Sequence, residues 1–299
     1  MSSNFPKLLV VSKTIFHALN NCDEKLCSFV KTYNVVLPHT LAIECVISEP
    51  GKKPDKEPEK LIKGFYMAIK AGAKMGYQSP ELLKIETGTQ RLIESVVNET
   101  TTQQYKNSTP EIGKIMILQA ANSYKSVTQR KIDEFLECGR RMYKDISENK
   151  ECMKDFCKLK REERFKNWMQ CIDKNGFMNN AINAWFGKQI SDHADNNWFI
   201  WQYTRLWYAY CLDRCFKEIL YGTCIKKDIS NDLYDIEPVL YLLRADGLLT
   251  NDQELEIPLT RSAFPKKDVF KVNTSLNASW TVQHVFDDII NKIPTTYKN

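Results

Sequence analysis

The chain has 299 residues, of which 43% are hydrophobic and 26% are charged, a length and composition that match a globular protein of one large domain or two ordinary ones. No stretch approaches the roughly 18 uninterrupted apolar residues that a membrane span requires, so we expect no membrane contact. The net charge of +5 combines 42 basic and 37 acidic residues, and such a spread surplus is compatible with a nucleic-acid partner without indicating one.

The ten cysteines and the first residues of the chain indicate the cellular compartment of the protein. The first apolar run covers only about five residues and lacks a small-residue cleavage site, so it is interpreted as a strand and not as a signal peptide. The cysteines are a small fraction of a long chain and none has the C-x2-C spacing of a zinc knuckle. We therefore predict a cytoplasmic protein with reduced thiols.

The first 50 residues alternate between strand and helix patterns. Residues 7–11 are an apolar run that ends at Ser12, a hydroxyl residue suited to cap a helix. Residues 34–37 form a second apolar run, and the helix predicted after it carries Glu44. This βαβ alternation predicts a parallel sheet.

The middle of the chain has a different pattern. Residues 50–60 combine prolines with charges and predict a surface linker. From there to about residue 225, apolar residues recur every three or four positions, which predicts helices. Residues 98–109 are polar and predict a loop, residues 155–168 predict a helix with a solvated charged face, and the aromatic residues 196–221 predict a buried helix.

The last quarter of the chain returns to the strand and helix alternation. Asp232 and Asp235 stand at a predicted helix start, and a short apolar strand ends at Thr250 just before Asp252. A further strand is predicted near residues 267–272. We predict an α/β fold with a small parallel sheet flanked by helices, built from residues 1–50 and 226–299, with residues 51–225 as a large helical insertion.

Acidic residues from separate predicted elements suggest a metal site. Ligands of open parallel sheets bind beyond the carboxyl ends of the strands, where Asp252 is expected. Glu44, Asp232 and Asp235 are the other candidates, because one helix alone cannot surround a cation. Each acid taken singly is also explained as a helix cap, whereas their joint placement favours Mg²⁺ or Mn²⁺.

The order of KLLVVSKTIFHAL, LPHTLAIEC and NDLYDIEPVLYLLRADGLLTND resembles PIN-domain proteins, which have a metal-dependent ribonuclease fold. The resemblance covers residues 7–48 and 228–272. It implies that Glu44, Asp235 and Asp252 are catalytic metal ligands, with Asp232 as an alternate to Asp235 and with Thr250 and Ser12 in support. Ser12 departs from the family pattern, which has aspartate there, and Lys13 stands beside it.

The leading hypothesis is a metal-dependent endoribonuclease that hydrolyses phosphodiesters of single-stranded RNA, with Arg261, Lys266 and Lys267 in contact with the RNA backbone. The alternative, which Ser12 favours, is a catalytically inactive PIN-like module that binds RNA, or binds a protein partner through the helical insertion. A third interpretation is another α/β fold in which the acids are caps, and it predicts that Glu44 lies far from Asp252.

Overall fold

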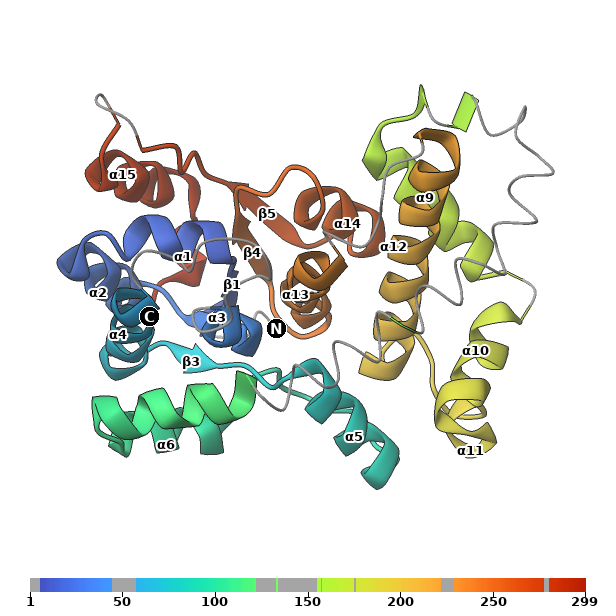
Figure 1. Ribbon diagram of the computed structural model, residues 1–299, viewed down its shortest axis with the longest axis horizontal. Coiled ribbons are helices and arrows are strands. Elements are labelled where there is room, and N and C mark those ends of the chain that lie inside the picture. The colour runs from blue at the N-terminus through green and yellow to red at the C-terminus, as the bar shows by residue number, and fades with distance from the viewer. Residues whose placement is uncertain are drawn as a thin grey trace.

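The computed structural model describes residues 6–44, 58–121, 133, 155, 156, 158–174, 176–221, 229–276 and 280–299. Its strands are β1 (Leu9–Val11), β2 (Val35–Leu37), β3 (Lys74–Met75), β4 (Gly247–Thr250) and β5 (Asp268–Lys271). They form one sheet in the order β3-β2-β1-β4-β5, and every neighbouring pair is parallel (Figure 1). The predicted α/β fold with a parallel sheet is confirmed.

Helices cover both faces of this sheet, and further helices lie beside it. They are α1 (Lys13–Leu19), α2 (Asp23–Thr32), α3 (His39–Glu44), α4 (Pro58–Ala71), α5 (Ser79–Thr89), α6 (Glu99–Asn107), α9 (Arg161–Ile172), α10 (Phe177–Phe186), α11 (Lys188–Ser191), α12 (Phe199–Tyr221), α13 (Ile229–Leu240), α14 (Glu256–Ala263) and α15 (Val282–Lys292), with short 3-10 turns η2 (Tyr241–Leu243) and η3 (Thr295–Tyr297). Residues 110–121 are also helical. No described helix has both the length and the apolar character needed to cross a membrane.

The three central strands β2, β1 and β4 are buried on both faces, and their alternate side chains enter two separate cores. Val10 and Leu248 face a core built with α5, α9, α12, α13 and α14. Leu9 and Leu249 face a core built with α1, α2, α4 and α15. Successive side chains of a strand point to opposite faces, so short apolar runs without polar alternation are the expected sequence of such a sheet.

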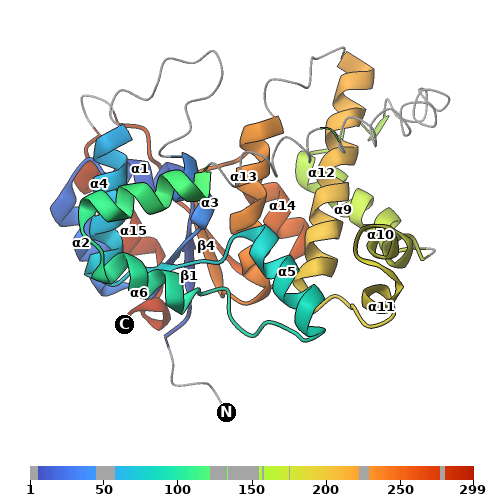
Figure 2. The same ribbon diagram turned by 60° about the horizontal axis from the view of Figure 1, so that its bottom comes forward.

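The helical middle region lies beside the sheet and packs against α13 and α14. Figures 1 and 2 both show α13 between β4 and α12, with α9 and α10 beyond. On α12, Phe199, Trp207 and Tyr210 are almost fully buried, as the aromatic pattern of residues 196–221 predicts, whereas Trp201 and Tyr208 are half-buried. The described cysteines, Cys22, Cys27, Cys171, Cys211 and Cys215, form no disulfides.

Three local features differ from the sequence prediction. β3 lies within residues 51–225, so the sheet takes one strand from the segment predicted as a helical insertion. Residues 98–109 were predicted as a loop, but they form α6, because the Asn98 side chain caps the helix and Tyr105 is buried. The charged face of residues 155–168 is not fully solvated, since Arg164 is only 8% exposed.

Candidate functional site

The carboxyl ends of β1 and β4 place two loops side by side. The two strands are parallel neighbours, with Val11 opposite Leu249, so both chains leave the sheet at the same edge. After β1, Ser12 occupies the N-cap position of α1 without a capping hydrogen bond from its side chain, and Lys13 begins the helix. After β4, Asn251 to Leu255 lead into α14. An edge of this kind is where open parallel sheets bind their ligands.

Three acidic side chains meet at this edge and are called the acidic cluster below. Asp235 comes from α13, Asp252 follows β4, and Glu256 begins α14. One carboxylate oxygen of each lies within 4.8 Å of the others. Asp235 and Asp252 are partly exposed, whereas Glu256 is only 2% exposed. The cluster opens into a pocket of about 580 Å³, whose walls also include Lys13 and Thr14.

Hydrogen bonds fix the two acids that follow β4. The Asp252 carboxylate accepts the backbone N–H groups of Glu254 at 2.7 Å and Leu255 at 3.0 Å, which shapes the turn into α14. The buried Thr250 hydroxyl donates to the Glu256 carboxylate and accepts the backbone N–H of Asp252 at 2.9 Å. Thr250 therefore fixes the Glu256 carboxylate and the backbone of Asp252.

The charge balance of this pocket favours a cation. Three carboxylates this close repel one another unless positive charge lies near them. Oxygen ligands of one divalent cation lie about 3 to 5 Å apart, since metal–oxygen bonds are about 2.0 to 2.6 Å long. The spacing in the acidic cluster is within that range. The Lys13 ammonium is a competing source of positive charge, because this residue lines the same pocket.

Other residues predicted for the site have different surroundings. The Asp232 carboxylate accepts hydrogen bonds from Tyr210 at 2.8 Å and Arg214 Nε at 2.8 Å. Ser12 is 1% exposed, and its hydroxyl lies 3.1 Å from that of Thr14. Glu44 is the last residue of α3, and its side chain lies outside the part of the chain that is described.

Of the basic residues predicted to contact RNA, two lie at the other edge of the sheet from the acidic cluster and one is paired with α9. Arg261 is paired with Glu162 of α9 at 3.4 Å. Lys266 and Lys267 precede β5, so they lie at the opposite edge of the sheet from Asp252. Lys267 donates to the carbonyl of Ala245 at 2.7 Å, and its burial lowers the pKa of its ammonium group.

Comparison with known proteins gives no relative. No family model, curated protein or solved structure matches the chain.

Two acids missed by the sequence analysis are central to this edge. Glu256 is four residues from Asp252, and its place in the first helical turn is the signal that marks it. Glu237 is 1% exposed in α13, and its carboxylate accepts the backbone N–H groups of Thr40 at 3.0 Å and Ser79 at 2.8 Å. Burial raises the pKa of Glu237 despite these bonds. Glu237 thus joins α13 to the segments that follow β2 and β3.

Proposed function

We propose that the chain is a divalent-metal-dependent endoribonuclease of the PIN-domain type, which hydrolyses phosphodiesters of single-stranded RNA with Mg²⁺ or Mn²⁺. The observation that carries the proposal is the acidic cluster, in which three carboxylates from different elements converge at the carboxyl edge of β1 and β4. Carboxylate oxygens are the ligands that these hard cations prefer.

The residues of the site would have separate roles in the reaction. A bound cation would activate water and neutralise charge on the phosphate. Asp235, Asp252 and Glu256 would hold it, with Glu256 fixed by Thr250. In the reaction, a water oxygen bonds to phosphorus, the bond from phosphorus to the ribose oxygen breaks, and that oxygen takes up a proton. Lys13 lines the pocket and can pair with a phosphate oxygen.

We expect the Asp252→Asn variant to cleave RNA at least about 100-fold more slowly than the wild type, because loss of a residue that only orients a metal ligand already costs about 10- to 100-fold. The measurement is cleavage of end-labelled single-stranded RNA in Mn²⁺, with chelator as a blank. Glu256→Gln should show a similar loss. Asp173→Asn is the matched control, since this carboxylate pairs with Arg205 at 2.7 Å in the helical region.

Equal cleavage by the wild type and both site variants would contradict the proposal. The second candidate function is a catalytically inactive module that binds RNA or a protein partner. The position of Lys13 favours it, because an ammonium group in the pocket competes with a cation for the same carboxylates. Specific RNA or protein binding without metal-dependent cleavage would select this second function.

A further inference from the structure

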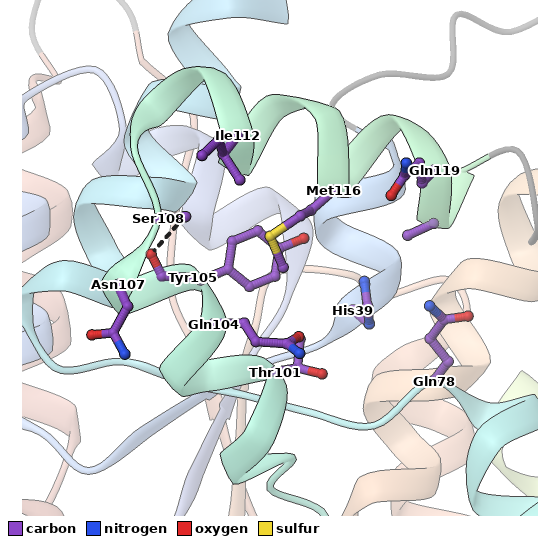
Figure 3. Close-up of a pocket in the computed structure, with 11 residues that line it drawn as sticks. His39, Gln78, Thr101, Gln104, Tyr105, Asn107, Ser108, Ile112, Met116 and Gln119 are labelled. Atoms are coloured by element: carbon purple, nitrogen blue, oxygen red, sulfur yellow. Dashed lines mark hydrogen bonds between the residues drawn. The ribbon is translucent and has the colours of Figure 1, made fainter.

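A second pocket lies at the same edge of the sheet, beyond β2 and β3, and is called the His39 pocket below. Its volume is about 680 Å³, within the range of about 300 to 1,000 Å³ that small-molecule sites have. His39 begins α3 after β2, and Gln78 follows β3. The other walls are residues of α6 and of the helical residues 110–121, as Figure 3 shows.

His39 is the unusual group in this pocket. The residue is only 6% exposed, and neither Nδ1 nor Nε2 has a hydrogen-bond partner among the residues that the structure describes. Buried polar atoms are nearly always paired, so two unpaired ring nitrogens point to a missing partner. Figure 3 shows His39 among the side chains that line the pocket, with Tyr105 on one side and Gln78 on the other. Burial lowers the pKa of His39 to about 4, so at neutral pH the ring offers one donor and one acceptor.

The remaining lining residues select a neutral ligand rich in donors and acceptors. Four of the residues that line the pocket have side-chain amides, namely Gln78, Gln104, Asn107 and Gln119. None of the described lining residues is acidic, lysine or arginine, so a phosphate or an ammonium group would find no opposite charge there. Met116 and the Tyr105 ring add apolar surface. Amides that hydrogen-bond a base edge, beside apolar and aromatic surface, are how proteins recognise nucleobases of single-stranded RNA.

The position of the pocket relative to the acidic cluster fits one RNA strand. Adjacent strands lie about 4.8 Å apart, so the gap between β2 and β3 is roughly 10 Å from the gap between β1 and β4. A short stretch of RNA spans that distance. Helix α13 connects both sites, since Asp235 belongs to the acidic cluster and Glu237 holds the backbone of Thr40 and Ser79, next to His39 and Gln78.

We propose that the His39 pocket binds one nucleobase of single-stranded RNA, whose backbone continues to the acidic cluster. The RNA part of this inference rests on the proposed function, whereas recognition of the base needs only the pocket. The base hydrogen-bonds to the His39 ring and to the amide of Gln104, and it packs against Met116.

The test is nucleoside binding, measured by NMR without divalent metal in the Asp252→Asn background. The chain has four histidines, so the imidazole C–H signals are few, and the His39→Ala spectrum assigns the signal of His39. We expect at least one of adenosine, guanosine, cytidine and uridine to shift that signal. Gln104→Leu should weaken binding about fivefold or more, the effect of losing one good amide–base contact. Gln103→Leu is the matched control, because Gln103 is the preceding residue of α6, is exposed and does not line the pocket.

Two results would overturn the inference. One is the absence of any shift with all four nucleosides, which would mean that water alone occupies the pocket. The other is equal binding by Gln104→Leu and Gln103→Leu. This outcome can be distinguished from that of the nuclease proposal. Nucleoside binding without RNA cleavage supports the base pocket and rejects the nuclease. RNA cleavage without nucleoside binding supports the nuclease and rejects the base pocket.

Discussion

Replacing Asp213 with asparagine is expected to lower the free energy of unfolding by about 3 to 5 kcal/mol. The Asp213 side chain on α12 is fully buried, and it accepts hydrogen bonds from Arg161 Nε at 3.0 Å and Arg164 Nε at 2.7 Å. Both arginines belong to α9 and are largely buried. The variant keeps the shape of the side chain but leaves two guanidinium charges without their counter-charge, which is the costly outcome for a buried ion pair.

Urea denaturation followed by circular dichroism measures this loss. Asp173→Asn is again the control, because its partly exposed ion pair with Arg205 is worth about 1 kcal/mol or less. Loss of this ion pair should also disturb the candidate site, because Arg161 donates to the backbone carbonyl of Glu254, in the loop that carries Asp252. A difference of less than 1 kcal/mol between Asp213→Asn and the wild type would contradict the pairing described here.

Replacing Glu237 with alanine is expected to cost about 3 kcal/mol or more. The change leaves the buried N–H groups of Thr40 and Ser79, and the Ser79 hydroxyl that donates at 2.7 Å, without an acceptor. A buried donor that loses its partner costs about 1 to 3 kcal/mol, so the sum is large even when water replaces one bond. The same denaturation measurement applies, and a loss of under 1 kcal/mol would count against this network.

The Glu237→Gln variant keeps one acceptor oxygen but cannot carry a negative charge. It therefore distinguishes the effect of the charge on stability from the effect of the hydrogen bonds. Because burial raises the pKa of Glu237, the folded chain holds that proton more tightly than the unfolded chain. The stability of the wild type relative to Glu237→Gln should therefore increase as the pH falls through the raised pKa of Glu237 towards the ordinary range of a carboxyl group. An unchanged difference between the two proteins across that interval would show that the group does not titrate there.

The strands were predictable because local sequence determines them. The runs at residues 9–11, 35–37 and 247–250 are apolar, short and bounded by turn or capping residues, which suffices for buried parallel strands. β3 has only two residues, Lys74 and Met75, and no apolar run marks it. Pairing with β2 determines where β3 forms, and the strand propensity of two residues does not predict that pairing.

The candidate site was predictable only in part, for the same physical reason. Asp252 was predicted because an acid directly after a strand is visible in sequence. Asp235 was predicted at a helix start, but it lies inside α13, beyond the first turn that holds Asp232. Asp232 has the same signal, yet its carboxylate bonds to Arg214, which lies 18 residues earlier on another helix. Glu237 acquires its role from Thr40 and Ser79, and partners so distant in the sequence cannot be inferred from spacing. Glu256 is bonded to the nearby Thr250, a contact that the turn between β4 and α14 makes possible.

The most direct test of the account is calorimetric titration of the chain with Mn²⁺. The acidic cluster predicts at least one bound ion, with a dissociation constant raised about 100-fold or more in the Asp252→Asn, Glu256→Gln double variant. Asp232→Asn should bind as the wild type does, since its carboxylate is already paired with Arg214. Absence of Mn²⁺ binding, or equal binding by the wild type and the double variant, would contradict the claim that these three carboxylates form one cation site.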